Sequence, residues 1–178
     1  MKSKMVKEIM APVSQYTAIS QEATLYEAIL ALKTDQEKLD PVILVHNERQ
    51  KIIGVVTRLD VLRGLEHAYK KIGDLRYVSH SGFSPEFIKS LIDQYGFWQR
   101  PLGDICSKSV DTKIKDFMYT PKEGEFVEQN ASLDEAIHQL IMGNHHNLLV
   151  TRNQEIVGIL SLNDMFSEIY RRTKVCET

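Results

Sequence analysis

Several features that define other classes of protein are scarce or absent in this sequence. It has only two cysteines, Cys106 and Cys176, which lie far apart and outside any CxxC pattern. This argues against a disulfide framework or a structural zinc site and fits a reducing compartment. The sequence has no run of about 18 apolar residues and no N-terminal apolar stretch of signal-peptide length. We therefore expect a cytoplasmic protein without a transmembrane helix.

Neither sign of charge dominates the chain. Lysine and arginine number 22 and aspartate and glutamate 24, so the formal net charge is −2. We therefore expect no bulk attraction to nucleic acid or to an anionic membrane. The sequence also lacks a P-loop, a GxSxG motif and an HExxH motif, which indicates a protein other than an enzyme. An alternative catalytic site would have to use His67, His80 or Cys106, for which unrelated surface positions are the other interpretation.

An internal repeat is the most informative feature that is present. Three blocks of the first half recur in the same order in the second half, two at an offset of 108 residues and the last at 104. The change of offset places a small length difference between the first helix and the following hairpin. The matched blocks are Val6–Met10 with Ile114–Met118, Ala23–Ile29 with Ala131–Ile137, and Gly54–Asp60 with Gly158–Asp164.

Each repeat predicts the order β-α-β-β-α. Capping-box spacings at Thr24 and Ser132, each with a glutamate three residues later, predict the start of the first helix. Apolar residues then recur at i, i+3, i+4 and i+7, which is typical of one buried helix face. Apolar runs around a polar turn predict a buried hairpin, and the last helix should begin near Thr57 or Ser161. The expected strands are 16–20, 42–45 and 52–56, then 125–129, 148–150 and 156–160.

The chain divides into four parts: repeat 1 over 1–66, an insert over 67–111, repeat 2 over 112–172, and a tail over 173–178. One repeat alone would bury too little surface. We therefore predict a mixed α/β (α+β) fold in which the two repeats pack as a pseudo-twofold pair.

The insert predicts a helix of its own. Ser84-Pro85-Glu86 is typical of a helix start, with a serine cap and proline at the first position. Gly96 is a plausible end. The aromatic cluster Tyr95, Phe97 and Trp98 is interpreted as core, a lid or a partner surface, with core packing favoured because aromatic side chains bury the most area.

The repeated motif G-h-h-[ST]-x-x-D, at Gly54–Asp60 and Gly158–Asp164, resembles the cystathionine-β-synthase (CBS) domain. This domain occurs as tandem pairs called Bateman modules, and both copies here follow an I-M segment, a helix and a hairpin. The resemblance implies a stand-alone regulatory module that binds AMP, ADP or ATP in the cleft between the repeats. It also implies a homodimer, an unidentified regulated protein, and no catalytic activity or enzyme cofactor.

In nucleotide-binding members of the family, the hydroxyl residue and the aspartate of this motif hold the ribose. The resemblance thus implies ribose contacts for Thr57 with Asp60 and for Ser161 with Asp164. A carboxylate can accept both O–H donors of a vicinal diol, and such charge-assisted bonds are stronger than neutral ones. The same spacing also caps a helix without any ligand, and a cap and a ribose site can coexist.

Phosphate contacts are implied for a basic pair before the second strand. In the γ subunit of AMP-activated kinase, which has CBS repeats, a similarly placed pair meets the phosphates, and His145 and His146 align with it. Two surface histidines are the alternative. Repeat 1 has Asp40 there, so we favour the site formed by Ser161, Asp164 and His145.

The remaining candidates for ligand contacts come from the motifs and from the strand entrances. Arg58 and Asn163, inside the two motifs, are further phosphate candidates. Adenine could lie against Val13, Tyr16 and Ala18 or the stretch 121–126, for which strand packing is the alternative.

Two other functions stay open. The ligand could be S-adenosylmethionine, which shares the adenosine but lacks phosphates. The chain could instead be a ligand-independent interaction or dimerisation module, in which Asp60 and Asp164 serve only as helix caps.

Overall fold

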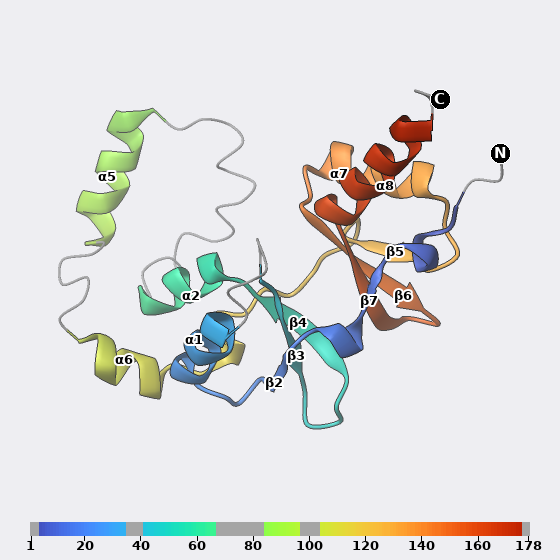
Figure 1. Cartoon of the computed structure of the whole chain (residues 1–178). Coiled ribbons are helices and arrows are strands. Elements are labelled where there is room, and N and C mark those ends of the chain that lie inside the picture. The colour runs from blue at the N-terminus through green and yellow to red at the C-terminus, as the bar shows by residue number, and fades with distance from the viewer. Residues whose placement is uncertain (1–3, 35–40, 67–83, 97–103, 176–178) are drawn as a thin grey trace. The chain divides into compact units, whose positions relative to one another are not determined.

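The computed structural model describes residues 4–34, 41–66, 84–96 and 104–175 of the chain (Figure 1). The chain forms two compact units. The first contains residues 1–18, 44–55 and 120–178, and the second contains residues 19–43 and 56–119. Each unit therefore combines segments from both repeats. The predicted mixed α/β fold is confirmed, and no helix in the described ranges is long and apolar enough to cross a bilayer.

Repeat 1 has the predicted β-α-β-β-α order. The Thr24 amide donates to Glu27 Oε2 at 2.7 Å, and the Glu27 amide donates to Thr24 Oγ1 at 3.3 Å, so the predicted capping box is present. The helix that follows buries Leu25, Ala28 and Leu32, as its spacing predicts. The three strands form one sheet in the order β2-β3-β4. The elements are β2 (Ala18–Ser20), α1 (Leu25–Thr34), β3 (Ile43–His46), β4 (Ile52–Val56) and α2 (Arg58–Leu65).

Repeat 2 has the same order; its first strand is shorter than the predicted 125–129, and its other two strands are longer than the predicted 148–150 and 156–160. The Ser132 hydroxyl accepts the Glu135 amide at 3.2 Å, which is one of the two bonds of the predicted capping box. Figure 1 shows α7 and α8 together on the sheet β5-β6-β7, where they bury a core that includes Leu133, Leu148 and Met165. The elements are β5 (Phe126–Glu128), α7 (Leu133–Gly143), β6 (Asn147–Arg152), β7 (Glu155–Ser161) and α8 (Leu162–Val175).

A strand that the sequence did not predict completes this sheet. β1 (Ala11–Pro12) pairs antiparallel with β7, which gives the order β1-β7-β6-β5. A β-carbon on Gly158 would lie 2.7 Å from the Ala11 carbonyl oxygen and 2.9 Å from Met10 Sδ. The glycine of the repeated motif therefore gives the N-terminal segment room to pair with β7.

The leading segment of each repeat packs on the body of the other repeat. In the first unit, η1 (Val6–Glu8) joins repeat 2, because the Val6 amide donates to Ala131 O at 3.0 Å. In the second unit, η3 (Ile114–Asp116) joins repeat 1, because the Ile114 amide donates to Ala23 O at 2.9 Å. Val6 and Ile114 are both fully buried. Each repeat body thus completes its core with residues of the other repeat, whereas the pseudo-twofold packing of the whole pair stays a prediction.

The insert contains the predicted helix and one more. Ser84 Oγ accepts the Phe87 amide at 3.2 Å at the start of α5 (Pro85–Tyr95), and Gly96 ends the helix at φ 64°. The second helix, α6 (Ile105–Asp111), was not predicted; it packs against α1 and α2. Cys106 is exposed on α6 and Tyr95 is partly buried. Phe97, Trp98, His67, His80 and Asp40 lie outside the described residues.

Candidate functional site

One edge of the β1-β7-β6-β5 sheet gathers the candidate residues of repeat 2. β5 and β6 are parallel and start at the same edge, and antiparallel β7 ends there. Asn147 pairs with Ser161, and the Leu162 amide donates to His146 O at 2.8 Å. The residues before β5, before β6 and at the start of α8 therefore lie close together. We define the second-repeat edge as Glu125, His145, His146, Ser161 and Asp164.

Asp164 caps α8, as the ligand-free interpretation predicts, but it does so with one oxygen. The Ser161 amide and hydroxyl donate to Asp164 Oδ2 at 2.9 and 2.6 Å, and the Asp164 amide donates to Ser161 Oγ at 3.1 Å. Within the described ranges, no hydrogen bond reaches Asp164 Oδ1. Since an ionised carboxylate has about four lone-pair sites, this partly buried side chain keeps acceptor capacity while it caps the helix.

Asp60 is more fully occupied in repeat 1. The Thr57 hydroxyl and amide donate to Asp60 Oδ2 at 2.7 and 3.0 Å, which forms the same cap. In addition, Arg63 Nη1 donates to Asp60 Oδ1 at 3.3 Å, and only 4% of Asp60 is exposed. The position equivalent to Arg63 is Ser167, so repeat 2 has no such guanidinium. Both motifs therefore cap their helices in the same way, but Asp164 keeps more capacity to accept further hydrogen bonds than Asp60 does.

The two histidines of the second-repeat edge have different surroundings. His145 is 22% exposed, and its Nδ1 lies 3.9 Å from Glu125 Oε1. Its ring lies so close to Gly143 that a β-carbon there would overlap it. His146 is exposed, and its carbonyl oxygen accepts the Leu162 amide at the start of α8. His146 is thus the more exposed of the two rings, and the contact of either histidine with a ligand stays a prediction.

Glu125 lies in the stretch 121–126, which the sequence suggested for adenine, but its contact with His145 was not predicted. Its Oε2 accepts the Lys122 amide at 2.7 Å, and its carbonyl accepts the Leu149 amide at 2.8 Å. The side chain is 16% exposed. No local sequence pattern indicates this contact, because only the parallel pairing of β5 with β6 brings Glu125 to His145.

Apart from the stretch 121–126, which contains Glu125, the other sequence candidates lie outside the second-repeat edge. Val13 begins η2 (Val13–Gln15), which contacts β7, but Pro12 pairs with Gly158 and so places Val13 away from the Ser161 end. Tyr16 is partly buried, and Ala18 is exposed at the start of β2. Arg58 and Asn163 are exposed at the starts of α2 and α8. Their contacts with a ligand stay predictions, as does the cleft between the repeats.

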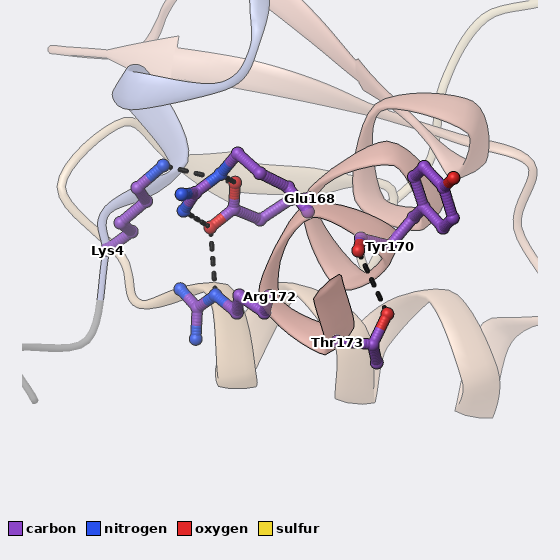
Figure 2. A network of polar contacts seen from close by, with 6 residues as sticks. Lys4, Glu168, Tyr170, Arg172 and Thr173 are labelled. Atoms are coloured by element: carbon purple, nitrogen blue, oxygen red, sulfur yellow. Dashed lines mark hydrogen bonds and ion pairs between the residues drawn. The ribbon is translucent and has the colours of Figure 1, made fainter. Parts of the chain in front are cut away.

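A separate ionic network joins α8 to the N-terminal segment (Figure 2). Glu168 is 6% exposed and receives Arg171 Nη2 at 2.9 Å, Arg172 Nε at 2.8 Å and Lys4 Nζ at 3.1 Å. Hydrogen bonds from Arg171, then Arg172, hold the pKa of Glu168 well below its usual range. In repeat 1 the equivalent position is Gly64, which lies against the Phe117 ring. No group of three His, Cys, Asp or Glu residues in the described part of the chain could hold a metal ion.

The fold and the repeated motif define a tandem-repeat module in which an aspartate caps the last helix of each repeat. The CBS domain family model matches residues 6–67 and 104–171, which is more than half of the chain. The chain therefore belongs to the CBS-domain family. Among curated proteins, no relative matches the sequence at a significant level.

Solved structures of CBS-domain proteins share the fold at low sequence identity. One is CBSX2 in complex with AMP, at 16% identity and TM-score 0.59, covering 95% of this chain and 98% of that chain. A CBS domain-containing protein of unknown function from Bacillus anthracis has 14% identity and TM-score 0.64, with 94% of each chain covered. The CBS domain of a bacterial CNNM/CorC family Mg²⁺ transporter has 21% identity and TM-score 0.57, covering 93% of this chain and 74% of that chain.

Proposed function

We propose that this chain is a regulatory module that binds an adenine nucleotide at the second-repeat edge. The observation that carries the proposal is Asp164 Oδ1, a carboxylate oxygen that receives no hydrogen bond within the described ranges. In this proposal it accepts a ribose hydroxyl, while Oδ2 remains bonded to Ser161. The ligand then adds to the helix cap and does not replace it.

The surroundings of Asp164 suit a phosphate group nearby. α8 is 14 residues long and begins directly after Ser161, so its N-terminus favours an anion. The exposed His146 lies beside that N-terminus. CBSX2, a fold neighbour, was crystallised with AMP, which supports an adenine nucleotide as the ligand class.

The motif of repeat 1 serves as the weaker site in this proposal. Any ribose hydroxyl that reached Asp60 Oδ1 would have to compete with Arg63 for a nearly buried carboxylate. Removing a charged hydrogen-bonding partner costs about 1.5–3 kcal/mol. We therefore expect one strong nucleotide site per chain.

Calorimetry with adenosine, AMP, ADP, ATP and S-adenosylmethionine tests the proposal. Asp164→Asn keeps an oxygen for the cap but loses the charge, so nucleotide affinity should fall about tenfold or more, roughly 1.4 kcal/mol. Asp60→Asn is the matched control and should change affinity less than about threefold. The melting temperature without ligand checks the fold of both variants, and saturating nucleotide should raise it for the wild type.

Two outcomes would contradict the proposal. If no adenine compound binds the wild type, the ligand-independent alternative is favoured. If a nucleotide binds and Asp164→Asn keeps its affinity, the ribose assignment is wrong. Incubation with ATP and analysis for ADP, AMP and pyrophosphate tests the accompanying proposal that the chain binds nucleotide without turning it over.

The regulatory role requires a second surface. Leu62 on α2 and Phe166 on α8 occupy equivalent positions and are 53% and 70% exposed. Equivalent apolar side chains on both repeats match a self-complementary contact with a second copy of the chain. We therefore propose a cytoplasmic homodimer whose arrangement responds to the nucleotide and biases a regulated protein. Light scattering of the wild type and Phe166→Glu tests it; a monomeric wild type would refute it.

A further inference from the structure

Glu125 places a fixed negative charge at the edge where the phosphate is proposed to bind. Its carboxylate is tied down at one oxygen by the Lys122 amide, at 2.7 Å, and its other oxygen faces His145 Nδ1 at 3.9 Å. The side chain is only 16% exposed, so water screens it incompletely. The charge therefore stays at the second-repeat edge and cannot swing away into solvent.

This carboxylate reduces the positive charge that His145 and His146 can present to an anion. A protonated His145 would be balanced by Glu125, which leaves His146 as the exposed imidazole of the edge. Each additional ligand phosphate would therefore add negative charge near Glu125 without gaining a second basic partner from this pair. A cationic ligand would experience the opposite effect.

We propose that Glu125 makes the second-repeat edge selective for adenosine ligands with little negative charge or with a cationic tail, and against the triphosphate. This inference rests on the proposed nucleotide site. The ligand class it selects is a nucleoside monophosphate or a sulfonium-bearing adenosine. Two unit charges at roughly 7 Å and an effective dielectric of about 40 interact by about 1 kcal/mol, which corresponds to about fivefold in affinity.

The test compares Glu125→Gln with Glu123→Gln by calorimetry. Glutamine at 125 keeps an oxygen for the Lys122 amide, so the turn should stay intact. Glu123 lies two residues away and is exposed, so its variant removes the same charge without the contact to His145. The ligands are adenosine, AMP, ATP and S-adenosylmethionine at low ionic strength.

The expected result is that Glu125→Gln changes the affinities for ATP and for S-adenosylmethionine in opposite directions. Glu125→Gln should strengthen ATP binding relative to AMP by about three- to tenfold and weaken S-adenosylmethionine by a similar factor. Adenosine affinity should stay within about twofold, and Glu123→Gln should leave every ratio within about twofold. The change of sign separates a charge effect from a loosened fold, which would weaken all ligands together.

Two negative results are distinguishable. If AMP binds the wild type and Glu125→Gln leaves the ATP-to-AMP ratio unchanged, the selectivity inference is overturned while the nucleotide site stands. If the wild type binds none of the four ligands, the proposed function itself is overturned, and the selectivity inference with it.

Discussion

Helices α2 and α8 occupy the same place in the two repeats, and their differences show how one fold position supports different chemistry. Both begin with a hydroxyl residue and an aspartate that form the same cap. Three residues after that aspartate, Arg63 in α2 satisfies the remaining oxygen of Asp60, whereas Ser167 in α8 leaves Asp164 without that partner. The cap motif thus provides a helix start in both repeats and an available acceptor in one.

The next position along these helices differs in the same way. Gly64 receives the Phe117 ring from the leading segment of repeat 2, while Glu168 receives Lys4 from the start of the chain. One leading segment is held by apolar packing at this point and the other by an ionic network. The second arrangement depends on pH and salt, and the first does not.

The largest effect should come from the buried residues of the leading segments. Ile114→Ala should lower the free energy of unfolding by about 2–5 kcal/mol, because it leaves a cavity at a fully buried position. Val6→Ala removes one carbon fewer, so its cost should be smaller by about 0.8 kcal/mol. Urea denaturation measures both. Ile141→Ala, at a 70% exposed position, is the control and should cost less than about 0.5 kcal/mol.

The two close-contact glycines should respond differently to a methyl group. Gly158→Ala should cost about 1–3 kcal/mol, since the β-carbon would lie 2.7 Å from the Ala11 backbone oxygen. Gly64→Ala meets the Phe117 ring at 2.9 Å, and a side chain can shift more easily than paired backbone. Alanine also gains about 1 kcal/mol in a helix, so this variant should be nearly neutral. If both variants lowered the melting temperature equally, the expected difference between the two glycines would be refuted.

Exchanging the residues that distinguish the two motifs should exchange their properties. Ser167→Arg places a guanidinium within reach of Asp164 and should weaken nucleotide binding about tenfold, the cost of displacing one charged partner. Arg63→Ser removes the partner of Asp60 and should add a second, weaker site. Calorimetric stoichiometry and affinity measure both. Unchanged binding in both variants would show that this residue does not set the difference between the motifs.

The smallest effect concerns the ionic network of Glu168. Its pKa is lowered in the folded protein, so its contribution to stability is present above the unfolded pKa of about 4.3. That contribution is lost as the pH falls through the lowered value. The melting temperature of the wild type should therefore fall more steeply below pH 5 than that of Glu168→Gln. Glu155→Gln, at an exposed position, should follow the wild type.

The sequence predicted the elements of the repeats because their signals are local. The Thr24–Glu27 capping box, the Ser84-Pro85 helix start and the apolar stripe of α1 each involve residues within two turns of one another. Such patterns fix hydrogen bonds and burial without reference to distant residues. Helix α6 was missed because its seven residues carry no capping hydrogen bond and too short a pattern.

The sequence by itself determined the repeat, the order of its elements and the hydroxyl–aspartate pair at the start of each last helix. Only the tertiary structure decided that β1 joins β7, that Glu125 reaches His145, and that each leading segment completes the core of the other repeat. The physical reason is sequence separation. Strand pairing and side-chain contacts between residues far apart depend on how whole elements assemble, and no local pattern records them.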